Sequence, residues 1–212
     1  MLLVTFFFLS CSNERREKND DGIVVVEANE TKRLDLIGFV NIQNDQAKKL
    51  FWKASELENN GDFYLSINKL NKANQFISEA NKIEPNNADI LNEFGVIKMR
   101  LHQFNLSEKY FRQAIKINSS CFGAFINMGL MYYYWNKYND GIIILKSMNF
   151  KKASNSFISS NYFHLFMNYT GLQNCDSAYC YYMKFKNLNT NKLSDDNIEK
   201  FKREKYDILN CK

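Results

Sequence analysis

Hydrophobic positions recur along this chain at spacings of three and four residues, which is the period of an amphipathic helix. Between residues 88 and 155 the whole pattern repeats with a period of about 34 residues. Residues 88–121 and 122–155 therefore form two similar stretches. Six pairs of positions match at this spacing: Leu91 and Phe125, Phe94 and Met128, Gly95 and Gly129, Phe104 and Tyr138, Phe111 and Leu145, and Ala114 and Met148.

A helix–turn–helix pair has about this length, and stacked pairs bury faces that one pair leaves exposed. The period therefore predicts an all-α stack of such pairs. Gly95 and Gly129 fall inside predicted helices, where glycine costs about 1 kcal/mol relative to alanine, so both positions predict close packing of a neighbouring helix. An ordinary amphipathic bundle with a coincidental period is the alternative.

The pattern continues on both sides of the two matched units. Behind them, Tyr162, Leu165 and Tyr169 repeat the first-helix spacing and predict a further unit over residues 156–192. In front of them, Pro85 is the only proline of the chain and ends a helical run. The unit predicted over residues 47–87 has a second helix longer by two turns, with a packing stripe of Ser66, Ala73 and Ala80.

Residues 193–212 predict a last helix. Ser194 is the expected N-cap, and Asp195 and Asp196 occupy the first turn, where acidic residues are favourable. One face is apolar and the other is charged. A terminal repeat needs a polar-faced cap, so this helix is predicted to cap the stack, with a regulatory tail as the alternative.

These residues resemble the tetratricopeptide repeats, a family whose pattern asks for an aromatic, Leu-Gly and Tyr in the first helix and Ala, Phe and Pro in the second. The matching positions are Phe125, Met128, Gly129 and Tyr132; Ala73, Ile77 and Pro85; and Tyr162, Leu165, Tyr169 and Ala178. Ser107 and Gly141 depart from the pattern because they replace its small alanine. The resemblance implies a right-handed helical-repeat solenoid of about four units, with a concave groove that binds peptides or proteins.

A second apolar stripe runs along the predicted first helices, beside the stripe that packs them. A helix that is apolar on two sides must bury both or offer one to a partner. We expect the second stripe to line the groove, although the fourth unit or the terminal helix is an equally good candidate to cover it. The predicted groove residues are Asn92, Val96, Met99, Arg100, Ile126, Leu130, Tyr133, Tyr134, Phe163 and Met167.

The amino terminus carries a separate signal. Residues 2–9 are apolar but too few to span a bilayer, which takes about 20 residues. Their length fits the core of a signal peptide, and Ser10 followed by Cys11 resembles the lipobox of bacterial lipoproteins. That resemblance implies a signal peptide over 1–10, lipid on Cys11 and a partly ordered lead-in over 11–46. A non-cleaved apolar start is the alternative.

Composition narrows the possible functions. The net charge is +5, but basic residues are spread among 23 acids and form no run, which argues against nucleic acid as a partner. The chain contains no catalytic motif with its full set of partners. Neither histidine has neighbours at ligand spacing, so no metal or cofactor is expected. The remaining cysteines, Cys121, Cys175, Cys180 and Cys211, include no C-x-x-C pair, and free, buried thiols are expected.

The sequence thus predicts a non-enzymatic, lipid-anchored scaffold of the bacterial cell envelope that holds a partner protein or peptide in its groove. An envelope enzyme or small-ligand binder framed by the same repeats is the alternative. It requires polar side chains that converge in the groove, and the predicted groove offers few.

Overall fold

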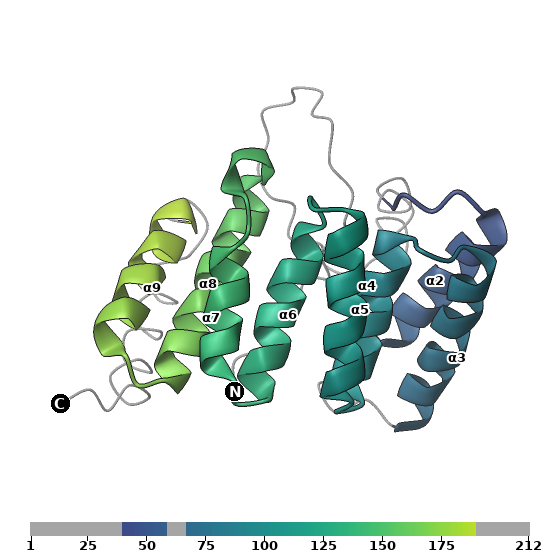
Figure 1. Ribbon diagram of the computed structural model, residues 1–212, viewed down its shortest axis with the longest axis horizontal. Coiled ribbons are helices and arrows are strands. Elements are labelled where there is room, and N and C mark those ends of the chain that lie inside the picture. The colour runs from purple at the N-terminus through teal and green to yellow at the C-terminus, as the bar shows by residue number, and fades with distance from the viewer. Residues whose placement is uncertain (1–39, 59–66, 190–212) are drawn as a thin grey trace. The chain divides into compact units, whose positions relative to one another are not determined.

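The computed structural model describes residues 40–58 and 67–189, and this part of the chain consists of α-helices, one short 3-10 helix and connecting turns (Figure 1). The prediction of an all-α fold is confirmed. Cys11, Ser66 and the predicted cap over residues 193–212 lie outside the described residues. The chain divides into two compact units, with the boundary between Asn127 and Met128.

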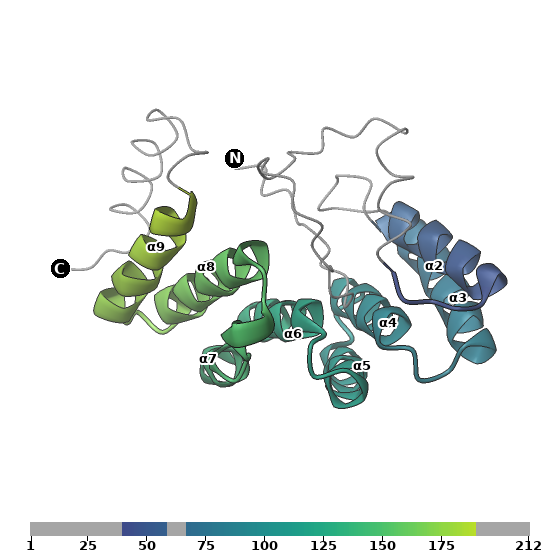
Figure 2. The same cartoon turned by 90° about the horizontal axis from the view of Figure 1, so that it is seen from above.

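The first unit contains two complete helix pairs and the start of a third. The helices within a pair lie side by side, as the packing of α2 on α3 and of α4 on α5 shows (Figure 2). The helices are α2 (Asp45–Glu58), α3 (Ile67–Ile83), α4 (Ala88–Arg100), α5 (Phe104–Ile117) and the first part of α6 (Phe122–Tyr134).

The second unit begins inside α6 and continues through α7 (Tyr138–Lys146), the 3-10 helix η2 (Phe150–Lys152), α8 (Asn155–Gly171) and α9 (Cys175–Asn189). Helix α8 packs against both α7 and α9. The core of this unit is Ile142, Leu145, Leu165, Tyr169 and Ala178.

Local sequence explains where the helices of the first unit begin and end. Helix α3 ends two residues before Pro85. The side chain of Asn87 then caps α4 by accepting hydrogen bonds from the backbone N–H groups of Asp89 and Ile90. This cap satisfies two of the donors that the first turn of a helix leaves without intrahelical partners.

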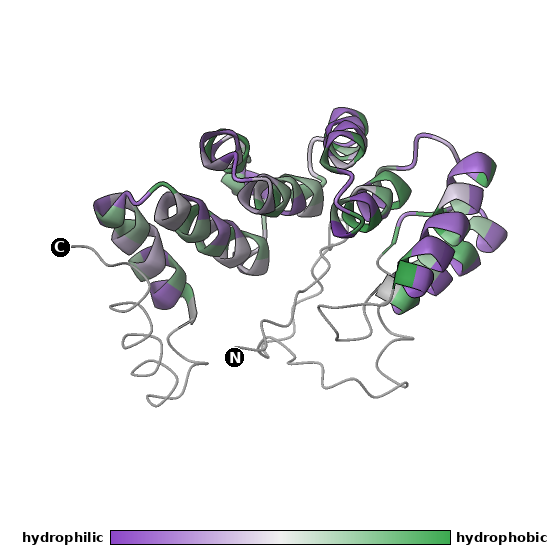
Figure 3. Ribbon diagram, turned by 90° about the horizontal axis from the view of Figure 1, so that it is seen from below, coloured by the Kyte–Doolittle hydropathy of each residue, from purple (hydrophilic) through white to green (hydrophobic). Residues whose placement is uncertain are grey.

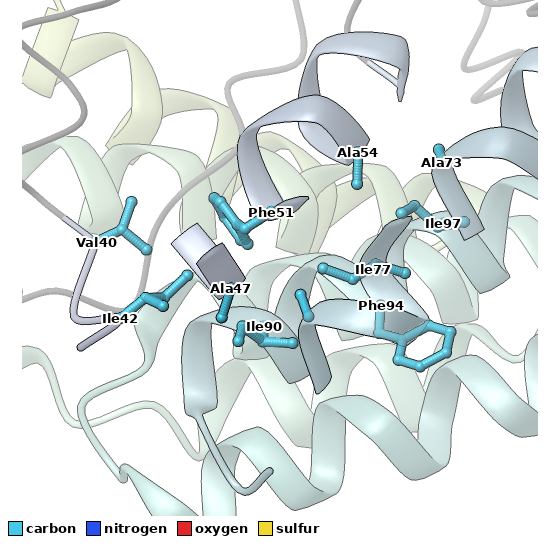
Figure 4. Close-up of a cluster of buried hydrophobic side chains, with 11 residues drawn as sticks. Val40, Ile42, Ala47, Phe51, Ala54, Ala73, Ile77, Ile90, Phe94 and Ile97 are labelled. Atoms are coloured by element: carbon cyan, nitrogen blue, oxygen red, sulfur yellow. The ribbon is translucent and has the colours of Figure 1, made fainter. Parts of the chain in front are cut away.

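The core of the first unit forms where the apolar faces of α2, α3 and α4 meet. Small buried residues, including Ala54 and Ala73, let the helices approach, and larger side chains fill the remaining space (Figure 4). Hydrophilic positions gather on the remaining faces of α2 and α3 (Figure 3). The buried cluster comprises Val40, Ile42, Ala47, Phe51, Ala54, Ala73, Ile77, Ala80, Ile90, Phe94 and Ile97.

The segment before α2 is tied to the turn between α3 and α4. The Glu84 carboxylate accepts hydrogen bonds from the backbone N–H groups of Gln43 (2.9 Å) and Asn44 (2.8 Å), and Asp89 accepts one from the N–H of Asn41 (3.0 Å). Val40 and Ile42 of the same segment are buried in the core. These contacts hold residues 40–44 against α3, α4 and the turn between them.

Three helix pairs share one turn geometry. His102, Asn136 and Gln173 all have positive φ, of 56°, 57° and 57°. In each turn the residue that follows donates its N–H to a carbonyl five residues back, as in a Schellman motif. His102 and Asn136 are one repeat period apart, whereas the interval from Asn136 to Gln173 is longer by three positions. Helix α8 accounts for the longer interval, because it has 17 residues where α6 has 13.

Candidate partner-binding surface

Hydrogen bonds between first helices of successive pairs give the first unit a polar ladder, defined here as Ser55, Asn92, Glu93 and Asn127. The side-chain amide of Asn127 on α6 donates to the Oδ1 of Asn92 on α4, over 3.1 Å. The Ser55 hydroxyl on α2 donates to the Glu93 carboxylate on α4. Glu93 and Asn127 are one repeat period apart, so the repeat places a buried polar group at the same position of two helices.

Glu93 is the ionisable residue of the ladder, and burial shifts its pKa. Its side chain is 3% exposed, and among the described residues its Oε1 has no hydrogen-bond partner. Burial raises the pKa of Glu93 to about 7, against the opposing effects of the Arg100 charge and the Ser55 hydrogen bond. The sequence gives no indication that Glu93 is buried, because a single acidic residue on a helix is usually exposed.

The predicted groove residues of the first unit lie mainly in the interior. Val96 and Ile126 are 0% and 2% exposed. Asn92 and Met99 are also buried, and Arg100 alone is partly exposed. Within this unit Asn92 is hydrogen-bonded to Asn127, the neighbour of Ile126 in the sequence.

The predicted groove residues of the second unit are more accessible. Leu130 is buried, whereas Tyr133, Tyr134, Phe163 and Met167 are partly exposed. The rings of Tyr133 and Tyr134 are 5.8 Å apart, and Tyr133 lies at the same distance from Tyr138. Burial and the neighbouring Tyr138 raise the pKa of Tyr133, so its hydroxyl stays protonated. The accessible part of the stripe in this unit is therefore mainly aromatic.

Phe163 belongs to a second aromatic group on α8 and α9. Its ring centre lies 5.3 Å from that of Phe185 and 6.1 Å from that of Phe166. Edge and tilted contacts of this kind hold aromatic rings in defined positions. Phe163 is thus a fixed, half-buried element of the stripe.

Three buried polar residues of α8 were not anticipated from sequence. The Asn168 amide donates to the carbonyls of Gly129 on α6 (3.2 Å) and His164 (2.9 Å), and that of Asn161 donates to the carbonyl of Leu145 on α7 (2.9 Å). The Nδ1 of His164 lies 2.7 Å from the carbonyl of Ser160, which only accepts, so Nδ1 carries the proton. Burial lowers the pKa of His164 to about 4, against the effect of that hydrogen bond.

The described residues can also be compared with the requirements of a metal site and of a membrane-spanning helix. Residues 40–58 and 67–189 contain no group of three or more His, Cys, Asp or Glu that could hold a metal ion. In the same ranges, no helix combines the length and apolar character that crossing a bilayer requires.

The cysteines differ from expectation. Cys121 and Cys175 each take part in a disulfide, so the prediction of free thiols is wrong for both. Cys180 is free but exposed rather than buried. Cys11 and Cys211 lie outside the described residues.

No protein-family model matches the chain, and no curated protein matches it significantly. A solved structure described as "MamA RS-1 ArsTM double mutant" does match, over 78% of this chain and 93% of that chain, with a TM-score of 0.50. MamA is a tetratricopeptide-repeat protein. At 17% sequence identity the likeness concerns the fold alone. The likeness supports a tetratricopeptide-like helical-repeat fold, and the all-helical architecture agrees with the prediction from sequence.

Proposed function

We propose that the protein is a non-enzymatic scaffold that binds a partner protein or peptide along its first helices and is held in the bacterial cell envelope by lipid on Cys11. The observation that carries the binding role is the aromatic part of the second stripe. Tyr133, Tyr134, Phe163 and Met167 remain partly exposed although most of α6 is buried. Tyrosines at interfaces supply large contact areas with few rotatable bonds, and they dominate many hot spots.

The helical-repeat fold supports this proposal because repeats of this kind present extended surfaces rather than a single deep site. The buried side chain of Leu130 lies one helical turn before Tyr133 and Tyr134 on α6 and would support them from below. In this proposal the working surface is centred on Tyr133 and Tyr134. It needs no cofactor, metal or nucleic acid.

Crosslinking in the native envelope tests the binding role. We expect a variant with Tyr133→Ala and Tyr134→Ala to capture its main crosslinked partner at least fivefold less well than the wild type. Tyr179→Ala is the matched control, because it removes an exposed tyrosine of α9 outside the stripe. Circular dichroism must show the same helix content in all three proteins. Undiminished capture by the double variant would refute the assignment of this surface.

The anchoring role rests on the apolar run before Ser10 and Cys11. In this proposal, lipid on Cys11 would hold the protein at a membrane of the envelope. Metabolic labelling with an alkyne-tagged fatty acid tests it, because label should enter the wild-type chain and be lost in Cys11→Ser. Equal labelling of the two chains would rule out lipid at this cysteine and leave the binding role untouched.

A further inference from the structure

A cluster of three tyrosines and two lysines lies where α7, α8 and α9 meet, and we call it the tyrosine–lysine cluster: Tyr162, Tyr169, Tyr181, Lys146 and Lys184. The rings of Tyr169 on α8 and Tyr181 on α9 stack, with centres 5.5 Å apart and planes 10° apart. Tyr162 lies two helical turns before Tyr169 on α8, and its ring centre is 6.0 Å from that of Tyr181. None of these five residues belongs to the predicted groove.

Each lysine of the cluster lies against a ring. The Nζ of Lys146 is 5.4 Å from the centre of Tyr169, and the Nζ of Lys184 is 4.8 Å from Tyr181 and 5.7 Å from Tyr162. These distances are within the range of cation–π attraction. The stacked rings therefore hold two ammonium groups around one aromatic platform.

The two ammonium groups lie at the surface. Both lysines are exposed. The hydrogen bond with the Tyr169 hydroxyl raises the pKa of Lys146, against a small effect of burial. Residues 128–189 contain six lysines, no arginine and only two acids, Asp140 and Asp176, which leaves an excess of four positive charges. An acidic partner is favoured by such a surface.

We propose that the tyrosine–lysine cluster binds an acidic segment of a partner protein, with Lys146 and Lys184 each pairing with a carboxylate and the partly exposed rings of Tyr162 and Tyr181 contacting the apolar parts of the segment. A free lysine loses much rotamer freedom when it pairs. Here the rings already restrict both side chains, so less freedom is lost on binding. Nucleic acid is a poorer fit, because its recognition needs basic residues spread along a face rather than two around a tyrosine stack.

The probe for a test is a fluorescein-labelled peptide of four Glu-Ala repeats, titrated with the full chain and followed by fluorescence anisotropy at low salt. We expect saturable binding to the wild type. Removing both charges with Lys146→Gln and Lys184→Gln should weaken binding about three- to tenfold, as expected for two exposed charge pairs. Tyr169→Phe keeps the ring but removes the hydroxyl that holds Lys146, and should weaken binding about twofold.

The control variant carries Lys151→Gln and Lys152→Gln, which remove the same charge from η2. We expect it to bind the peptide within twofold of the wild type. Equal loss in the two double variants, or no binding by the wild type, would overturn the proposal. A fluorescein-labelled oligothymidylate that binds more tightly than the peptide, and that also depends on Lys146 and Lys184, would overturn it in favour of nucleic acid. None of these variants alters Tyr133 or Tyr134, so the outcome is independent of the groove.

Discussion

Gly95 and Phe111 lie in such close contact that a Cβ atom added to the glycine would be 2.5 Å from the Cε1 of the phenylalanine. The same relationship recurs one repeat period later, where a Cβ on Gly129 would be 2.5 Å from the Cγ of Leu145. In both pairs the glycine belongs to a first helix and its neighbour to the second helix of the same pair. The absent side chain is what allows the two helices to approach.

We predict that Gly95→Ala and Gly129→Ala each destabilise the fold by about 1–3 kcal/mol, the typical cost of overpacking. Helix propensity alone would make alanine more stable than glycine here by about 1 kcal/mol. A loss of stability would therefore show that overpacking outweighs propensity. Urea unfolding followed by circular dichroism measures it. Leu145→Ala should reduce the cost of Gly129→Ala by about 1 kcal/mol or more in a double-mutant cycle. Additive effects of the two changes would contradict the proposed contact.

The backbone of Gln173 is strained in the turn between α8 and α9. Its φ of 57° is left-handed, which costs a residue with a Cβ about 1–2 kcal/mol. We predict that Gln173→Gly stabilises the protein by about 1 kcal/mol, since glycine adopts this conformation freely but loses more entropy on folding. Urea unfolding of the two proteins measures the difference.

Asn136 provides the matched control for Gln173, because it occupies the same position of the preceding turn with the same φ. Asparagine tolerates this conformation, and the Asn136 side chain also accepts a hydrogen bond from the Tyr138 hydroxyl (2.8 Å). We therefore expect Asn136→Gly to leave the unfolding free energy nearly unchanged, because the lost hydrogen bond offsets any relief of strain. A larger gain at Asn136 than at Gln173 would show that conformational cost does not govern these turns.

Burial of Glu93 makes the stability of the fold depend on pH. Its folded pKa of about 7 exceeds the ordinary value of 4.5, so between these values the folded chain holds a proton that the unfolded chain has released. The contribution of Glu93 to stability should fall as pH rises from about 4.5 to 7, by on the order of 3 kcal/mol in total. Glu93→Gln stays neutral and should lack this fall.

Thermal unfolding at a series of pH values checks this prediction. Glu93→Gln should approach the wild-type melting temperature near pH 5 and exceed it above pH 7. The control is Glu79→Gln, which changes an exposed carboxylate on α3. Parallel pH profiles for the wild type and Glu93→Gln would mean that the Glu93 carboxyl is not buried in solution.

Much of this architecture follows from the sequence because it depends on local rules. Pro85 marks the end of α3, and the paired glycines at 95 and 129 mark the close contacts of two helix pairs. The greater length of α8 could also be inferred, since Tyr162 matches Phe125 at a spacing of 37 rather than 34. Each of these features is encoded within one or two neighbouring helices.

Other features depend on contacts that no local pattern encodes. Ser107 replaces the small alanine of the family pattern, and its hydroxyl donates to the carbonyl of Gly95 over 2.7 Å. Gly141 replaces the same alanine one unit later, and the Asn168 side chain packs where a Cβ would be. The sequence identifies both residues as exceptions, but the partner of Gly141 belongs to the next helix pair. The burial of Glu93 has no sequence signal either, because its hydrogen-bond partner Ser55 belongs to the preceding helix pair.

His164 gives a pH dependence of opposite sign in the second unit. Its folded pKa of about 4 lies below the ordinary value of 6.5, so the unfolded chain binds a proton between these values that the folded chain does not. The contribution of His164 to stability should therefore fall as pH decreases from 6.5 to 4, by on the order of 3 kcal/mol in total. His164→Gln should lack this fall, and at pH 7 it should cost about 1 kcal/mol through the lost hydrogen bond to Ser160.

The pH dependences of Glu93 and His164 can be distinguished because they have opposite signs. Ionised Glu93 destabilises the fold toward neutral pH, and protonated His164 destabilises it toward acid. Between pH 4.5 and 6.5 the effects of Glu93 and His164 oppose each other, so the wild-type profile should be flatter than that of either single variant. Glu93→Gln should show a steeper loss toward acid, and His164→Gln a steeper loss toward neutral pH. His102→Asn, which changes the only other histidine at an exposed turn, serves as the control. A wild-type profile steeper than both single variants would refute the burial of both groups, because opposed protonation equilibria cannot add.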